Sequence, residues 1–288
     1  ADTELHPVFR AMDADPARRN VFGLMAAEPE IALAGIRLRQ FGQEIIEGLG
    51  GKKIHPSWTV PGGVRAPLSD ETRAHVRSRV PEAKRTVRLT LQKLKGLLDG
   101  FGEEAENFGN FPSLFMGLIG PGGSWEHYDG DIRITDATGA IVADGLKGAD
   151  FESFIAESVQ SDSYLKSPYY KPLGFPNGAY RVGPLARLNI CETMGPPEAD
   201  KELAEYRQRG GRVVTSSFWY HYARLVEVLA AIELIEGLID DPELASGRLR
   251  AHAGINNTNA VGASEAPRGT LFHHYNVDEN GLLTRVNM

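Results

Sequence analysis

The stretch Ser264-Glu265-Ala266-Pro267-Arg268-Gly269-Thr270-Leu271-Phe272-His273-His274-Tyr275 combines a rigid turn with a hydrophobic strand. Proline fixes φ, and the glycine after the arginine tolerates backbone conformations that other residues avoid. The chain is therefore expected to turn sharply at Pro267 and to present Arg268 from a stiff loop. Taken alone, the same pattern also fits an ordinary β-hairpin in which Arg268 is a surface charge.

His273 and His274 are neighbours on the strand that follows this turn. Successive side chains of a strand point to opposite faces, so the two rings are not expected to hold one metal ion together. Two separate, hydrogen-bonded histidines are the simpler interpretation.

The composition is that of a folded, acidic chain of 288 residues, with 42% hydrophobic residues and a formal net charge of −7. This length suits one large domain or two ordinary ones. The negative charge argues against broad electrostatic binding to nucleic acid or to an anionic membrane. No apolar run approaches the roughly 20 residues that a membrane span needs.

The single cysteine, Cys191, excludes an internal disulfide and fits a reducing compartment. We expect it to be a small buried residue rather than a metal ligand. No signal peptide is visible. The chain opens at Ala1 and closes at Arg285-Val286-Asn287-Met288, within an expected strand. These ends suggest the interior of a longer polypeptide.

Two long helices are expected in the first hundred residues. One starts at Glu28-Pro29-Glu30 and ends at Gly50-Gly51. Gly35 and Gly42 lie on one side of it, where another helix could approach closely.

The second helix is capped by Ser69 and ends at Gly100, and Pro81 is expected to kink or split it. Its apolar residues recur at helical spacing, which predicts a buried stripe. The members of this stripe are Val76, Val80, Ala83, Val87, Leu91, Leu94 and Leu98.

Residues 101–190 have the pattern of a mixed β insert. Residues 131–135 alternate with period two, residues 136–139 form a turn, and residues 140–143 return as a strand. Residues 151–159 are expected to form a short helix.

A helix over residues 217–239 is apolar almost all round, which is typical of a helix buried among others. Arg224 and Glu227 are three residues apart on it and are most simply an ion pair. The pattern predicts an α+β fold, a long-helix bundle with small antiparallel β-hairpins and sheets. We expect a single domain over residues 1–288, helical over 1–100, mixed β over 101–190, and helix plus β-hairpin over 191–288.

Several segments, in this order, resemble the large (catalytic) subunit of nickel–iron hydrogenases of the cytosolic, NAD-reducing (bidirectional) class. The resemblance covers most of residues 12–64 and 181–288 and is weaker over 101–180. The Pro-Gly-Gly block at 61–63 and the Glu-Ala-Pro-Arg-Gly block at 265–269 are together fairly specific. The resembling segments are residues 18–24, 36–46, 50–56, 222–227 and 265–275.

The resemblance implies an oxidoreductase that reversibly cleaves H2 into protons and electrons. Its cofactor would be a nickel–iron centre with diatomic ligands on iron, held by four thiolates from two Cys-x-x-Cys motifs. This sequence contains neither motif, so the thiolate ligands are expected outside it, and no residue here is predicted to bind the metals. The fragment alone is expected to be inactive.

The resemblance also implies partners and a location. Diaphorase subunits, carrying FMN and NAD, together with an iron–sulfur hydrogenase small subunit, would take the electrons in the cytoplasm. The chain shows no Gly-x-Gly-x-x-Gly motif between a strand and a helix, so it is not expected to bind NAD itself.

In the resembled family, the arginine that matches Arg268 extends its guanidinium over the open face of the metals. The resemblance therefore implies that Arg268 acts beside the metals and that Pro267 supports its loop. A fixed cation can stabilise charge that develops there. The alternative is a metal-free electron-transfer scaffold like the quinone-site subunit of respiratory NADH dehydrogenase, and the retained Glu-Ala-Pro-Arg-Gly block argues against it.

Overall fold

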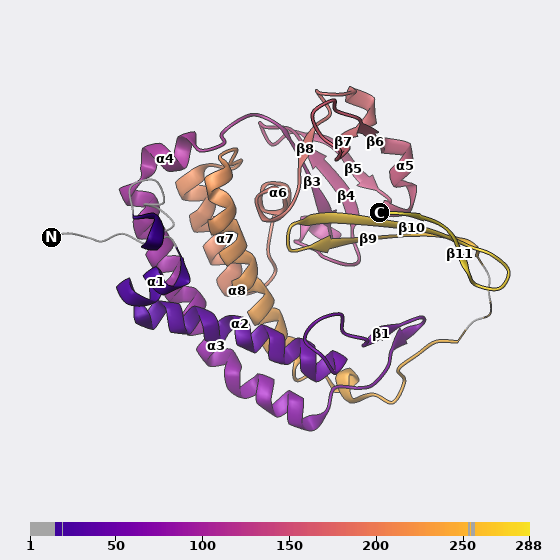
Figure 1. Cartoon of the computed structure of the whole chain (residues 1–288), viewed down its shortest axis with the longest axis horizontal. Helices are drawn as coiled ribbons and strands as arrows, with labels where there is room; N and C mark the ends of the chain where they lie inside the picture. The colour runs from indigo at the N-terminus through magenta and orange to yellow at the C-terminus, as the bar shows by residue number, and fades with distance from the viewer. Residues whose placement is uncertain (1–14, 19, 253, 255–256) are drawn as a thin grey trace. The chain divides into compact units, whose positions relative to one another are not determined.

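The computed structural model describes residues 15–18, 20–252, 254 and 257–288, so Arg19 of the first resembling segment lies outside the described residues. The described residues of Ala1–Phe101 and Ala231–Ala253 form one compact unit, and those of Gly102–Ala230 and Gly254–Met288 form a second. Helices and strands both occur, which confirms the α+β prediction (Figure 1). The single domain expected over the whole chain stays a prediction.

The first unit is mainly helical. Helices α2 and α3 pack against each other along their apolar sides (Figure 1). Gly51 ends α2 in the left-handed conformation at φ 76°, which favours glycine. In chain order the elements are η1 (Pro16–Arg18), α1 (Val21–Ala27), α2 (Pro29–Gly50), β1 (Thr59–Val60), β2 (Gly63–Val64), α3 (Asp70–Gly100) and η6 (Pro242–Ala245).

Helix α3 confirms the predicted stripe, because all seven of its residues are buried. Ser69 caps the helix by accepting a hydrogen bond from the backbone of Thr72 at 3.1 Å. The prediction that Pro81 could split the helix is wrong, since α3 runs through it without a break. Proline removes one backbone donor, but the burial of Val80 and Ala83 beside it favours a continuous helix.

The glycines of α2 differ from expectation. Gly35 and Gly42 are exposed, and a Cβ added at either would meet no atom of the described residues within 4 Å. The close packing lies at the end of the helix instead. A Cβ at Gly48 would lie 2.4 Å from Thr72, and one at Gly50 would lie 2.2 Å from Pro56, where the chain turns back.

The second unit combines two larger sheets with short and long helices. Its four-stranded sheet has the order β5-β4-β3-β8, and its three-stranded sheet has the order β11-β10-β9. In chain order the elements are α4 (Gly102–Asn107), β3 (Leu114–Ile119), η2 (Pro121–Gly123), β4 (Asp131–Thr135), β5 (Ile141–Leu146), η3 (Gly148–Asp150), α5 (Phe151–Phe154), β6 (Ile155–Ser158), β7 (Ser167–Tyr170), η4 (Lys171–Leu173), β8 (Tyr180–Arg181), α6 (Pro184–Ile190), α7 (Pro197–Gly210), η5 (Ser217–Trp219), α8 (Tyr220–Leu238, which continues into the first unit), β9 (Asn259–Ala266), β10 (Gly269–Val277) and β11 (Leu283–Asn287).

Strand β3 is buried on both faces. On one face its side chains join a hydrophobic core with β4, β6 and α5. On the other face Phe115 and Gly117 lie toward α6, which packs against this strand (Figure 1). A Cβ at Gly117 would lie 2.9 Å from Ile190, so glycine permits this close approach. The core residues of the first face are Leu114, Met116, Leu118, Ile132, Ile134, Phe154 and Ile155.

The β insert follows the prediction only in part. The hairpin of β4 and β5 is confirmed, although its second strand runs to Leu146. The helix expected over residues 151–159 is wrong beyond Phe154, because Ile155–Ser158 form a strand that pairs with β7. Burial of Ile155 and pairing with a distant strand outweigh the local helical preference.

We expect Leu91→Ala to lower the free energy of unfolding of the first unit by about 2–5 kcal/mol, because it leaves a cavity at a side chain that is 2% exposed. Leu89→Ala is the matched control on the same helix, since Leu89 is 40% exposed. It should change stability by only about 0.5 kcal/mol. Denaturant unfolding of the purified protein measures both, and equal effects would contradict this orientation of the helix.

Candidate functional site

Pro267 and Arg268 form the two-residue turn between β9 and β10, where Ala266 pairs with Gly269 (Figure 1). Both turn residues are exposed, in agreement with the sequence pattern. Among the residues that the structure describes, the guanidinium of Arg268 has no hydrogen-bond or ion-pair partner. The turn therefore presents an uncompensated cation.

Two glycines bring this turn against the start of α6. Gly269 has φ 151°, and a Cβ there would lie 2.2 Å from Val182. Gly183, the N-cap of α6, has φ 87°, and a Cβ there would lie 2.7 Å from the carbonyl oxygen of Arg268. Larger residues at either position would push the turn away from α6.

Arg187 lies one helical turn after Gly183 and is 1% exposed. Its guanidinium donates hydrogen bonds to the carbonyl oxygens of Ala266 at 3.0 Å and Pro267 at 3.4 Å. The backbone of the turn is thus held by a buried side chain of α6.

Two carboxylates hold Arg187. Its Nε and Nη2 donate to Glu227 of α8 at 2.5 and 2.8 Å in the strong bidentate geometry, and its Nη1 donates to Glu265 of β9 at 2.7 Å. Burial lowers the pKa of Arg187, but the hydrogen bond and charge of Glu227, with those of Glu265, outweigh it and raise the pKa above its ordinary value. We call these three residues the Arg187 cluster.

Neutral donors complete the cluster. The Trp125 indole donates to Glu227 at 2.9 Å. The Leu118 backbone and the Thr270 hydroxyl donate to Glu265 at 3.0 and 2.7 Å. These bonds matter because buried carboxylates are costly unless their oxygens are hydrogen-bonded.

The predicted ion pair between Arg224 and Glu227 is wrong. Arg224 is exposed, whereas Glu227 is buried and faces Arg187. The two residues share a helix, but they do not share an environment. The functional residues that sequence reasoning missed are therefore Arg187 and its two carboxylates. One signal pointed to them, an arginine within the apolar run Pro184–Ile190.

His127 lies beside the Arg187 cluster. Its carbonyl oxygen accepts a hydrogen bond from the backbone of Glu265 at 2.8 Å, and its ring packs 4.0 Å from that of Trp125. Burial lowers the pKa of His127, and the Arg187 cation lowers it further, against the opposing charges of Glu227 and Glu126. The imidazole is therefore held in its neutral form.

The two histidines of β10 have separate partners, as predicted. His273 Nδ1 lies 2.7 Å from the Tyr275 hydroxyl, and His274 Nδ1 lies 3.2 Å from Glu152. They do not form a joint metal site.

No group of three or more His, Cys, Asp or Glu side chains in the described part of the chain is placed to hold a metal ion. Cys191 is fully buried, and burial raises the pKa of its thiol to about 12 against the opposing charges of Arg207 and Arg212. A protonated, enclosed thiol is a poor metal ligand. The residues present therefore do not supply the ligands of a nickel–iron centre.

Comparison with known proteins gives relatives along nearly the whole chain. A subunit of the F420-non-reducing hydrogenase vhu of Methanococcus voltae is 36% identical over 96% of this chain and 65% of that protein. The NAD-reducing hydrogenase HoxS subunit beta of Cupriavidus necator is 35% identical over 96% of this chain and 58% of that protein. No protein-family model matches.

The structural comparison agrees. The crystal structure of an NAD+-reducing [NiFe]-hydrogenase in the H2-reduced state superposes with a TM-score of 0.94 and 40% identity, over 98% of this chain and 62% of that one. The chain belongs to the nickel–iron hydrogenase family. A Ni-Fe-Se hydrogenase from D. vulgaris Hildenborough, 18% identical with a TM-score of 0.68, shares the fold. The chain spans less than two thirds of the length of each of these relatives.

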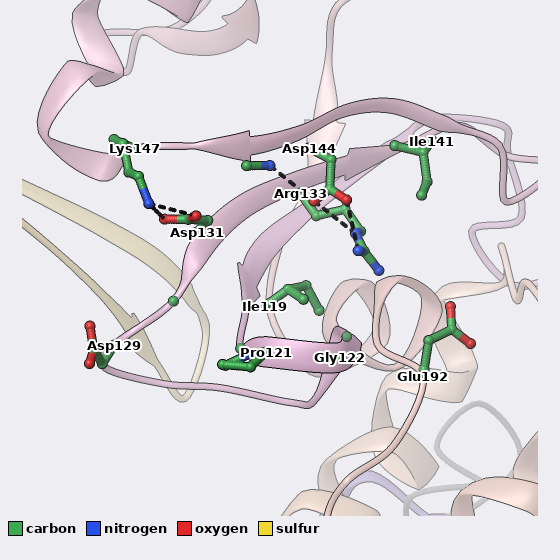
Figure 2. A pocket seen from close by; sticks show the side chains of 14 residues that line it. Ile119, Pro121, Gly122, Asp129, Asp131, Arg133, Ile141, Asp144, Lys147 and Glu192 are labelled. Atoms are coloured by element: carbon green, nitrogen blue, oxygen red, sulfur yellow. Dashed lines mark hydrogen bonds and ion pairs between the residues drawn. The ribbon is translucent and has the colours of Figure 1, made fainter.

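This hydrogenase-family chain also has a cavity of about 920 Å³ in its second unit, lined by the turn at Gly120–Gly123 and by β4 and β5. Figure 2 shows its charged side chains already paired within the wall, Arg133 with Asp144 at 2.8 Å and Lys147 with Asp131 at 2.6 Å. Arg268 does not line it. None of the described helices is long and apolar enough to cross a membrane.

We expect Gly269→Ala to destabilise the hydrogenase-family hairpin by about 1–3 kcal/mol, because φ 151° and the contact with Val182 both disfavour a side chain. Gly262→Ala on the paired strand is the control, since a Cβ there meets nothing within 4 Å. Thermal unfolding separates the two. An unaffected Gly269→Ala protein would contradict the close approach of the turn to α6.

Stability should fall on acidification from about pH 7 to 5. The lowered pKa of His127 means that the unfolded chain takes up a proton first, so stability is full above the unfolded pKa and is lost as pH falls through the folded one. His127→Gln should flatten this loss. It should not abolish it, because burial and then Arg224 also lower the pKa of His221.

The control for that measurement is His252→Gln, at an exposed position of the first unit. Denaturation midpoints across this pH range measure the effect. A His127→Gln profile that parallels the unmodified one would rule out the burial of a neutral imidazole.

Proposed function

We propose that the protein containing this chain is the large subunit of a nickel–iron hydrogenase, which reversibly cleaves H2 into protons and electrons. The observation that carries the proposal is the 40% identity and TM-score of 0.94 with an NAD+-reducing [NiFe]-hydrogenase over 98% of the chain. Because the chain spans less than two thirds of its relatives, the activity belongs to the whole subunit in its complex.

The metal ligands would come from parts of the protein outside this sequence. The sequence has one cysteine, and its thiol is enclosed. When bound, the nickel–iron group would supply the redox chemistry of H2 cleavage. What this chain contributes is the rigid turn and its cation.

Arg268 is proposed as the residue that acts from this turn, with Pro267 as its support. A guanidinium is charged at every working pH, and here no partner among the described residues neutralises it. A preorganised cation stabilises negative charge that develops next to it without the cost of reorienting solvent.

The proposal includes partners for electron transfer. They are diaphorase subunits with FMN, which pass electrons to NAD in the cytoplasm, and an iron–sulfur small subunit. Two of the relatives are NAD-reducing hydrogenases, which supports NAD as the acceptor. A metal-free scaffold is not favoured, because relatives at 34–38% identity are all hydrogenases.

Purification of the full-length protein with its natural partners tests the proposed function. Nickel and iron content and H2-dependent reduction of NAD are the measurements. A complex that contains both metals and reduces NAD with H2 supports it. A complex without nickel, or one inert toward H2, would overturn it.

Arg268→Lys in that complex is expected to lower turnover on the order of 10–100-fold while the metal content is unchanged. Lysine keeps the charge but loses the planar fork and carries the charge at a different reach. Arg224→Lys, at another exposed arginine of the same unit, is the control and should be silent. Unchanged turnover in Arg268→Lys would remove Arg268 from the mechanism.

A further inference from the structure

We propose that Arg187 is a positioning residue, which fixes the backbone of the turn at Pro267 and Arg268 and thereby sets where the Arg268 guanidinium acts. This role rests on the proposed function, since it matters for turnover only if Arg268 does. The geometry on which it stands is independent of that function.

One face of α6 makes both contacts with the turn. Gly183 lies against the carbonyl of Arg268, and Arg187, four residues later, reaches the carbonyls of Ala266 and Pro267. Residues four apart share one side of a helix, so these contacts come from a single rigid surface. Three consecutive carbonyl groups of the hairpin are thus referenced to α6.

The guanidinium of Arg187 has no donor to spare. Its Nε and Nη2 donate to Glu227, and Nη1 donates to Glu265. The second donors of Nη1 and Nη2 go to Ala266 and Pro267. All five N–H groups of the arginine are used, whereas a lysine offers three donors from one atom.

Glu265 extends the same restraint to both strands of the hairpin. It precedes the turn on β9, and its carboxylate accepts from Arg187, from Thr270 just after the turn, and from the backbone of Leu118 on β3. The two ends of the turn therefore meet at one buried carboxylate. Any shift of the turn would break charged hydrogen bonds within the protein interior.

The neighbouring turn shows that a hairpin does not need such a device. Between β10 and β11, Asp278 accepts from the backbones of Asn280 and Leu282, and Gly281 donates to the Asp278 carbonyl. That turn is held by its own backbone and one local carboxylate. The buried cluster at the Arg268 turn exceeds what turn formation requires, which points to a need for a fixed position.

The test uses Arg187→Lys in the full-length protein within its complex. Hydrogen exchange of residues 266–270 reports on the turn, and exchange of residues 278–282 is the internal reference. Turnover is measured in Arg187→Lys, Arg268→Lys and the double variant. Arg79→Lys is the control, because Arg79 also pairs with two carboxylates, Glu44 and Glu82, but in the other unit.

We expect Arg187→Lys to speed exchange at residues 266–270 at least about tenfold, to leave the reference turn unchanged, and to lower turnover at least about fivefold. In the Arg268→Lys background the same substitution should lower turnover less than about twofold, because both changes act through one group. Unchanged exchange at the turn, or turnover losses that multiply in the double variant, would overturn the proposal.

Glu265→Gln is the second variant if Arg187→Lys does not assemble. Its amide keeps the oxygen that accepts from Leu118 and Thr270 and replaces the oxygen that accepts from Arg187. The same faster exchange and the same loss of additivity are expected, and their absence would overturn the proposal. A complex without nickel would defeat the proposed function but leave the exchange result to decide the positioning.

Discussion

The buried guanidinium of Arg187 is the interaction on which the second unit depends. It joins α6, α8 and β9 through Glu227 and Glu265, all three side chains being nearly inaccessible. A buried charge without its partner costs far more than an unmade surface contact, so these elements are stable only when they are together. The fold of this unit and the placement of its hairpin turn are therefore one problem with one solution.

The parts of the fold that could be predicted are those set by local chemistry. Pro267, Arg268 and Gly269 specify a tight turn by themselves, and the stripe of α3 repeats over a length that only a helix can satisfy. The parts that could not be predicted depend on distant residues. Strand β3 is a short apolar run whose period is ambiguous, and residues 155–158 become a strand only by pairing with β7.

The same division explains the site. Arg268 is recognisable from sequence, because its turn is specified by adjacent residues, but its support is not. Helical spacing pairs Glu227 with Arg224, yet the true partner of Glu227 is 40 residues earlier in the chain. The useful signal is chemical rather than positional. An arginine inside a short apolar helix must be either exposed or paired, and Arg187 is paired.

The charge of the Arg187 cluster also suits its place beside the turn. Two carboxylates and one guanidinium leave a formal charge of −1, with neutral donors from Trp125, Leu118 and Thr270 completing the hydrogen bonds. A lone buried arginine behind Arg268 would repel its cation, whereas a cluster with excess negative charge attracts it. Glu265 therefore has two effects at once, since it holds Arg187 in place and offsets the charge that would otherwise drive the Arg268 turn away from α6.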